Sequence, residues 1–399
     1  MDDSGSKGPG NRHRSTALRT FSTALMLAVT ATACASGPAN GEHGAAGAVA
    51  GQVIAADLDA EIAQYYLQDY PQAHPEGWHH TLAELESRLD QQFPEREVLE
   101  AVVTDHGSID LAALLFIHQI HSHERNREFA DCLAAMTRRI ERDDPEAELE
   151  KVRGEWHILL VPGWLHEDQA TTEADFARTR RALDEAGIPH ELLPTPQDGA
   201  VEENAARLAA RLRALEDAAR DVILVSASKS GAEVHYALGH LLTIEDTQHV
   251  RAWINAGGLI HGSPLADDWT RLPRSLLARP IMAWQGWSWD SLRSLRTDRT
   301  EARRAQISLP DHVLVTNYVG VPMGSQITHG AQGRYRRLGR LGPNDGATLL
   351  ADALVRDGIT VTEPGSDHYF LRGDIGMRTL AMTLATHAWI ADSPCADGD

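Results

Sequence analysis

The segment Asp221 to His235 carries the clearest structural signal in this chain, and it reads Asp-Val-Ile-Leu-Val-Ser-Ala-Ser-Lys-Ser-Gly-Ala-Glu-Val-His. Its four consecutive apolar residues, Val222 to Val225, predict a short, fully buried strand. From position 231 onward the apolar residues recur at helical spacing, so only five residues separate strand from helix. A turn this sharp needs small residues beside its apex. Ser228, with a serine two positions away on each side, is therefore expected above the carboxyl end of the strand and at a helix N-terminus.

This strand, turn and helix resemble the nucleophile elbow of the α/β-hydrolase family. The departure is that Ser226 and Ser230 stand where glycine is commonest, and Gly231 follows one residue later. A second register would place Ser230 at the apex, between Ser228 and Ala232. We favour Ser228, because Val225 then ends the strand where the family's turn requires it. The alternative without catalysis is an ordinary strand and helix joined by a polar turn, as in any α/β protein.

The first 33 residues have the pattern of a signal peptide. Four basic residues precede an apolar or small run, Phe21 to Ala33, that is too short to span a bilayer stably. The run ends in Ala-Thr-Ala-Cys34, which resembles the processing box of bacterial lipoproteins. This resemblance implies a lipidated Cys34 that anchors an exported protein in the cell envelope. The alternative is an ordinary secretory signal cut near Ala33 or Ser36, which would leave a secreted or periplasmic protein.

Composition limits the possible partners of the chain. With 399 residues, of which 42% are hydrophobic, it can bury a large core, and its net charge of −20 argues against nucleic acid as a partner. Among its three cysteines, Cys132 and Cys395 could pair in an exported protein, but the sequence leaves this open. No cysteine spacing suggests zinc. We expect neither a metal nor a cofactor.

The chain is expected to divide into four parts. A flexible tether, residues 34–55, follows the signal peptide and leads to a helical region at 56–153. Residues 154–394 then alternate strands with amphipathic helices, which predicts a mostly parallel sheet with helices on both faces. An irregular, tryptophan-bearing stretch around 259–310 lies where the family inserts a lid or cap. Its four tryptophans could line an apolar cleft or could hold the insertion onto the body; they are Trp269, Trp284, Trp287 and Trp289.

The resemblance also implies a base and an acid for the serine, in the order nucleophile, acid, histidine. Asp345 lies in a Gly-Pro-Asn-Asp-Gly turn, ahead of a helix expected at Ala347 to Leu354. His368 follows a strand expected at Ile359 to Thr362 and precedes the last helix. Three other carboxylates are candidates for the acid. Asp267 and Asp268 follow an earlier strand, and Asp367 is next to the histidine in the sequence, which makes it a poor partner.

In the family, two backbone amides bind the oxyanion, and here these are expected to be the amides of Lys229 and of Trp164, in the turn Pro-Gly-Trp. The resemblance thus implies a serine hydrolase that cleaves small-molecule or lipid esters through an acyl-enzyme. The same residues would also serve a thioesterase or an amidase. A hydrolase-fold protein that binds an acyl ligand or a partner without turnover is the alternative from another class. The oligomeric state is not predicted.

Overall fold

The computed structural model of the chain describes residues 44–70, 77–89, 93–142, 145–168, 172–216, 220–392 and 395. The expected signal peptide and Cys34 lie outside the described residues. Among the described residues, no helix combines the length and the hydropathy that a membrane crossing requires.

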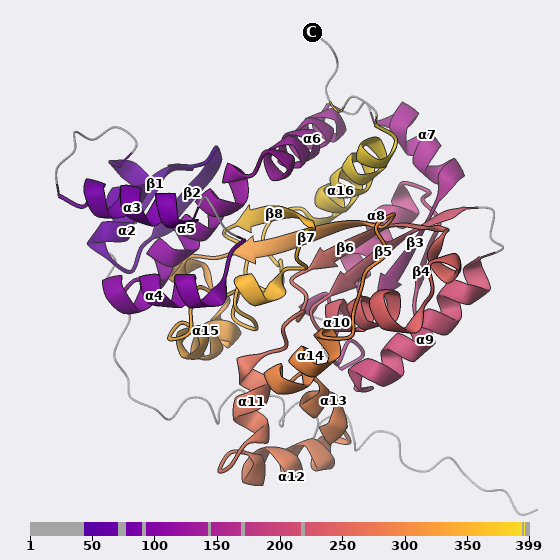
Figure 1. The fold of residues 1–399 in the computed structure, drawn as a ribbon. Helices are drawn as coiled ribbons and strands as arrows, with labels where there is room; N and C mark the ends of the chain where they lie inside the picture. Colours follow the sequence, from indigo (N-terminus) through magenta and orange to yellow (C-terminus); the bar gives the residue numbers. More distant parts are fainter. Residues whose placement is uncertain are drawn as a thin grey trace, which may run out of the picture.

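The centre of the molecule is one six-stranded sheet (Figure 1). Its strand order is β4-β3-β5-β6-β7-β8, and every neighbouring pair is parallel. The strands are β3 (Trp156–Val161), β4 (His190–Leu192), β5 (Asp221–Ala227), β6 (Val250–Ala256), β7 (Leu314–Val321) and β8 (Ile359–Pro364). The regular alternation of strands with helices in the sequence predicted this parallel sheet, and the prediction is confirmed.

Helices cover both faces of the sheet because its buried strands are apolar on both sides. Along β3, Ile158 and Leu160 point to one face, while Leu159 and Val161 point to the other. The first face is covered by α6 (Glu124–Glu141), α7 (Glu146–Glu155), α8 (Ala177–Glu185) and α16 (Ile375–Ile390). The second face is covered by α9 (Val201–Leu215) and α10 (Lys229–Tyr236).

The N-terminal region packs against one edge of this body (Figure 1). It consists of the antiparallel hairpin β1 (Gly44–Val49) and β2 (Gln52–Asp57), followed by α2 (Glu61–Gln68), α3 (His79–Leu89), α4 (Arg96–His106) and α5 (Ile109–Ser122). Its nearly apolar helix α5 is buried together with Val319, Val321 and Leu350 of the sheet domain. The two regions therefore share one continuous core.

The expectation of a flexible tether at 34–55 is wrong over residues 44–55, which form the hairpin. The small residues there serve close packing. An added Cβ at Gly47 would lie 2.3 Å from the carbonyl oxygen of Leu67, so β1 can approach α2 only with glycine at that position. Ala45, Val49 and Ile54 turn inward and are buried.

Four helices are inserted after β6, at α11 (Pro264–Thr270), α12 (Ser275–Gln285), α13 (Trp289–Ser294) and α14 (Thr297–Arg304). Their tryptophans take both of the roles that the sequence left open. Trp269, Trp287 and Trp289 pack against the small core of the insertion, and the first two also line the cavity described below. Trp284 on α12 is 62% exposed and does neither.

A second expectation also fails, because residues 347–354 do not form a helix. The chain turns back so that Asn344 pairs with Leu349 in an isolated antiparallel bridge, and only a short 3-10 turn follows, η6 (Ala351–Ala353). Between these elements and β7 lies the short helix α15 (Gln332–Leu338).

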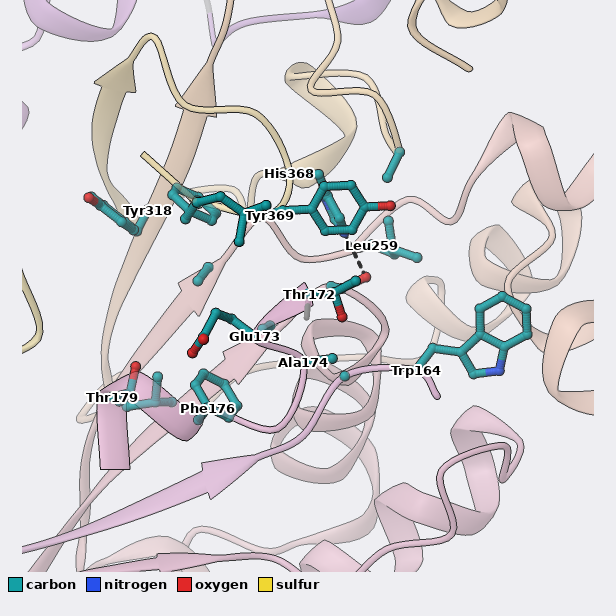
Figure 2. Close-up of a pocket in the computed structure, with 18 of the residues that line it drawn as sticks. Trp164, Thr172, Glu173, Ala174, Phe176, Thr179, Leu259, Tyr318, His368 and Tyr369 are labelled. Atoms are coloured by element: carbon teal, nitrogen blue, oxygen red, sulfur yellow. Dashed lines mark hydrogen bonds between the residues drawn. The ribbon is translucent and has the colours of Figure 1, made fainter. Parts of the chain in front are cut away.

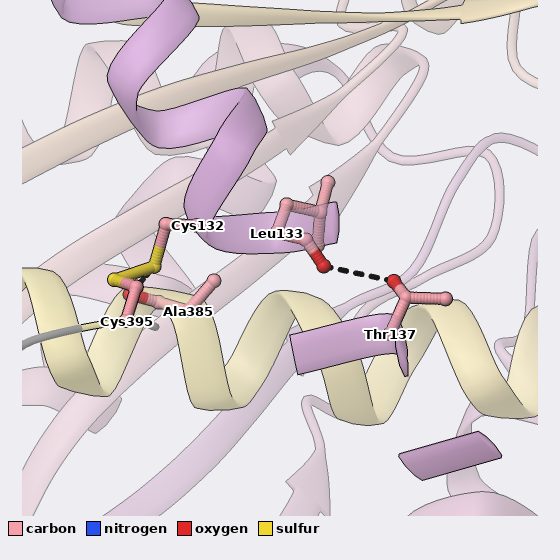
Figure 3. The surroundings of a disulfide bond; sticks show 5 residues. All are labelled: Cys132, Leu133, Thr137, Ala385 and Cys395. Carbon is pink, nitrogen blue, oxygen red and sulfur yellow. Dashed lines mark hydrogen bonds between the residues drawn. A yellow bond between two sulfur atoms is a disulfide. The ribbon is translucent and has the colours of Figure 1, made fainter. Parts of the chain in front are cut away.

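A disulfide joins Cys132 on α6 to Cys395, beyond the end of α16 (Figure 3). The two residues are 263 positions apart in the sequence. Helices α6 and α16 pack along each other, with Phe129 of α6 in edge contact with Trp389 of α16. The bond therefore fastens α6 to the chain beyond α16, the last helix of the sheet domain.

Candidate active site

Ser228 occupies the apex of a strained turn. It lies between the end of β5 and the start of α10, with φ 59° and ψ −123°, a backbone conformation that a residue with a side chain rarely adopts. The main chain fixes this conformation, since the Ser228 amide donates to the carbonyl of Ala256 (3.1 Å) and its own carbonyl accepts from the amides of Gly231 (3.0 Å) and Leu259 (2.9 Å). This backbone conformation directs the serine hydroxyl out of the turn toward the cavity.

The two flanking serines have structural partners of their own. The Ser226 hydroxyl accepts a hydrogen bond from the indole of Trp253 at 2.8 Å. The Ser230 hydroxyl lies 2.6 Å from the carbonyl of Val161, at the end of β3, and accepts from the amide of Ala227 at 2.9 Å. Ser230 is thus buried inside the turn and is not at its apex, which favours the first of the two registers considered for this stretch.

The structure explains why this chain has its glycine at position 231, one residue after the position where glycine is commonest in the family. A Cβ at this position would lie 2.6 Å from the side-chain oxygen of Asn255 and 2.7 Å from the Cα of Gly258. The first turn of α10 therefore presses directly on the loop after β6. In this chain the close contact between α10 and the loop after β6 occurs at Gly231. Serine side chains occupy the two positions that flank the apex.

His368 and Asp345 complete a hydrogen-bonded chain with the serine. The Nε2 atom of His368 is 2.8 Å from the Oγ of Ser228, and its Nδ1 atom is 2.8 Å from the Oδ2 of Asp345. The histidine side chain is 8% exposed and the aspartate 1%. The three side chains that the sequence singled out from positions 228, 345 and 368 thus meet at one point.

The main chain around Asp345 holds this arrangement in place. Its Oδ1 atom accepts hydrogen bonds from the amides of Ala347 and Thr348, each at 2.8 Å. The carbonyl of Asp345 accepts from the amide of His368 at 2.9 Å, so the two loops are joined directly. Oδ2 is therefore directed at the imidazole.

The other carboxylates that the sequence allowed are engaged elsewhere. Asp267 accepts from the amide and hydroxyl of Thr297, and Asp268 pairs with arginines of the insertion and of α15. Asp367 accepts from the amides of Thr328 (2.8 Å) and Tyr369 (3.2 Å). Asp345 alone among these four is hydrogen-bonded to the His368 ring.

Comparison with known proteins finds structural likeness only. No family model matches the chain, and no curated protein matches it in sequence. A metagenomic carboxyl esterase superposes with a TM-score of 0.49 at 20% identity, over 60% of this chain and 76% of the esterase. The mature lipase BlEst2 from Bacillus licheniformis superposes with a TM-score of 0.44 at 24% identity, over 55% of this chain and 86% of the lipase.

The two backbone amides that the sequence analysis expects to bind an oxyanion are those of Lys229 and Trp164. The amide of Lys229 begins α10, and that of Trp164 lies in the loop after β3. Neighbouring amides in these loops are engaged, with Gly163 donating to Ala174 and Leu165 to Gln197. Within the described part of the chain, no main-chain acceptor is paired with the Lys229 or Trp164 amide.

The side chain of Lys229 has a separate structural role that the sequence did not reveal. It is almost fully buried below the turn, where its ammonium pairs with Glu233 one helical turn later. Asn204 of α9 donates to the same carboxylate oxygen at 2.9 Å. This buried ion pair fixes the first turn of α10 onto α9. The i, i+4 spacing of a lysine and a glutamate was visible in the sequence, but such pairs normally lie on the surface.

A cavity of about 1010 Å³ opens at Ser228 and His368. Its walls are mainly apolar and come from the loop after β3, the inserted helices, the sheet, α8 and α16. Figure 2 shows Trp164 on one side of His368 and Phe176 with Thr179 on the other. In the described residues no group of three or more histidine, cysteine, aspartate or glutamate side chains is placed to bind a metal ion. The arrangement can accept an apolar molecule with a carbonyl at the serine.

Proposed function

We propose that this protein is a serine hydrolase that cleaves carboxylic esters through an acyl-enzyme. The observation that carries the proposal is the hydrogen-bonded chain from Ser228 through His368 to Asp345. A serine hydroxyl is a weak nucleophile until a base within hydrogen-bond reach can take its proton, and a carboxylate behind the base fixes the ring that does so.

In this mechanism the Oγ of Ser228 attacks the ester carbonyl carbon while Nε2 of His368 takes the hydroxyl proton. Asp345 holds the imidazole in the tautomer with hydrogen on Nδ1 and stabilises the imidazolium that forms. The negative oxygen that develops on the carbonyl would be stabilised by the amides of Lys229 and Trp164. The alcohol leaves with the proton from Nε2, and water then releases the acid by the same steps in reverse.

The test is labelling by a fluorophosphonate probe together with hydrolysis of p-nitrophenyl acetate. Ser228→Ala is expected to abolish labelling and to lower turnover by a factor on the order of 10⁶. Ser230→Ala is the matched control, since it removes a hydroxyl two residues away that hydrogen-bonds within the turn. If Ser228→Ala still labels, or if Ser230→Ala is the variant that loses labelling, the assignment of the nucleophile is wrong. A folded wild-type protein that neither labels nor hydrolyses the ester would instead be a non-catalytic binder.

We also propose that the protein is exported and anchored in the cell envelope through a lipid on Cys34. The leader pattern supports this, and so does the disulfide between Cys132 and Cys395, because such bonds persist in oxidising compartments. Expression of the full chain in a bacterial host, followed by detergent phase partition, tests the proposal. The wild type should partition with detergent and Cys34→Ala should not. Equal partition of the two proteins into the aqueous phase would contradict it.

A further inference from the structure

The cavity at Ser228 extends in two directions. One set of its lining residues belongs to the inserted helices and includes Leu265, Trp269 and Met282. The other set belongs to the interior of the sheet domain, between the strands and the helices α8 and α16. This second part, which we name the sheet-side arm, is lined by Ile158, Leu160, Val225, Ile254, Leu183 and Met382.

The register of the strands gives the depth of the sheet-side arm. Ile158 of β3 pairs with Ile223 of β5, which lies four residues before the end of β5 at Ala227 and five residues before Ser228. At about 3.3 Å per residue, the arm therefore reaches about 16 Å below the serine. An extended hydrocarbon chain advances about 1.25 Å per bond, from bonds of about 1.5 Å at near-tetrahedral angles, so roughly a dozen carbons span this depth.

Part of the wall of the arm comes from α6. Leu133 and Thr137 of α6 are among its lining residues, and Cys132, whose disulfide reaches past the end of α16, immediately precedes Leu133 (Figure 3). The hydroxyl of Thr137 donates to the carbonyl of Leu133 at 2.8 Å and so presents no free donor. This part of the wall is held in place by a covalent bond and by helix packing, and it suits a hydrocarbon chain.

Charged groups beside the arm neutralise one another. Glu363 of β8 pairs with Arg378 of α16 and accepts a hydrogen bond from the hydroxyl of Tyr318 at 2.7 Å. Burial raises the pKa of Glu363, and the arginine opposes that shift. Glu173 is paired in the same way with Arg178 at 2.8 Å. In each of these two pairs the charge of the glutamate is compensated, so a neutral, apolar ligand fits the arm better than a charged one.

We infer that the sheet-side arm is the subsite for the acyl chain, and that the substrates are esters of linear, medium-length fatty acids of about twelve carbons. This inference rests on the proposed function. The alcohol must leave before water can attack the acyl-enzyme, while the acyl chain stays bound to Ser228. The arm inside the sheet domain suits the group that stays, and the space under the inserted helices suits the group that leaves.

The experiment compares kcat/KM for p-nitrophenyl esters with acyl chains of 2, 4, 8, 12 and 16 carbons, each below its aggregation concentration. The wild type is expected to gain up to about fourfold per added methylene while the chain is being buried, and to decline between 12 and 16 carbons. Hydrolysis of the acetate with a flat profile beyond 4 carbons would overturn the inference and leave the proposed function intact. Failure of all esters, together with no fluorophosphonate labelling, would overturn the proposed function itself.

Two variants identify the arm that is used. Thr179→Phe places a ring between α8 and α16, where the Thr179 hydroxyl now lies 3.5 Å from that of Thr379. It is expected to lower kcat/KM for the dodecanoate at least tenfold and for the acetate less than threefold. Leu265→Phe, on the side of the inserted helices, is the matched control and should leave the chain-length profile unchanged. If Leu265→Phe shortens the preferred chain and Thr179→Phe does not, the acyl group lies on the other side. Thr179→Val keeps the volume of the native residue, so a wild-type profile in that variant shows that the phenylalanine acts by filling space.

Discussion

The substitution Asp345→Asn tests the arrangement of the site most sharply. The Oδ1 atom of Asp345 accepts from two backbone amides, those of Ala347 and Thr348, and these donors can be matched only by an oxygen. An asparagine must therefore keep its oxygen at that place and turn its NH2 group toward Nδ1 of His368. The NH2 group and an Nδ1–H group are both donors, so they cannot form a hydrogen bond with each other. The ring is expected to adopt the other tautomer, with hydrogen on Nε2, where it can no longer take the proton of Ser228.

The expected loss is about 10⁴-fold in kcat, the size associated with a wrong histidine tautomer in a serine triad, which corresponds to about 5.5 kcal/mol of transition-state stabilisation. The fold should lose far less. Both amide hydrogen bonds survive with a neutral acceptor in place of a charged one, at a cost of about 1 kcal/mol each. Activity and stability should thus separate clearly in this variant.

The assay is turnover of p-nitrophenyl acetate, measured together with the rate of fluorophosphonate labelling and with thermal unfolding. Both rates should fall by a similar factor, because both reactions use the same base. Asp367→Asn is the matched control, since it makes the same change in the residue next to His368 but at a carboxylate bonded to Thr328 and Tyr369. It should stay within tenfold of the wild type. A folded Asp345→Asn protein with more than a tenth of the wild-type kcat would refute the role of this carboxylate.

Three further predictions concern stability. Glu233→Gln leaves the ammonium of Lys229 buried without a carboxylate, so it should lower the free energy of unfolding in urea by about 3–5 kcal/mol. The double variant K229M/E233L should recover most of that loss, and an equal loss in the single and double variants would contradict this. Cys132→Ser should lower the free energy of unfolding by about 2–4 kcal/mol and make it insensitive to reductant; a wild type that is itself insensitive would be evidence against the bond. Burial and the charge of a neighbouring aspartate raise the pKa of Asp110 to about 7, so its contribution to stability is fully present below its unfolded pKa of about 4 and is lost as pH rises through about 7. Asp110→Asn should flatten the decline of stability over that range, and an unchanged slope would count against the assignment.

The elements that position the serine could be predicted because their signals are local. Four apolar residues followed by a helical pattern predict β5 and α10, although β5 ends two residues later and α10 begins two residues earlier than the pattern indicates. The small residues between them permit only a sharp turn, with Ser228 favoured over Ser230 at its apex. The roles of Asp345 and His368 are predicted from their order in the chain and from their positions in loops that follow late strands. Their separation from the serine and from each other was not predictable, because it depends on the loop contacts between Asp345 and His368.

The two wrong expectations have one physical origin, since local composition does not reveal what a segment packs against. Residues 44–55 have the small side chains of a tether, yet Gly47 is small because α2 crosses it closely. After Asp345 the sequence has the cap of a helix, and the carboxylate does accept from the amides two and three residues later, as a capping aspartate would. The chain then turns back to pair Asn344 with Leu349. The local hydrogen bonds could be predicted from the sequence, whereas the pairing of Asn344 with Leu349, which replaces the expected helix, could not.

The role of the N-terminal helical region had no signal in the sequence, and the structure indicates one. Helix α6 belongs to that region along the chain, but Phe129, Cys132 and Met136 are buried in the core of the sheet domain. Leu133, between them, reaches the cavity. The same helix therefore packs on α16 and forms part of the cavity wall, and the disulfide keeps it there. A bond across 263 residues cannot be read from spacing, and neither can a cavity wall supplied by a distant helix. Substrate length in this protein is thus expected to depend on residues that lie outside the segment resembling a hydrolase.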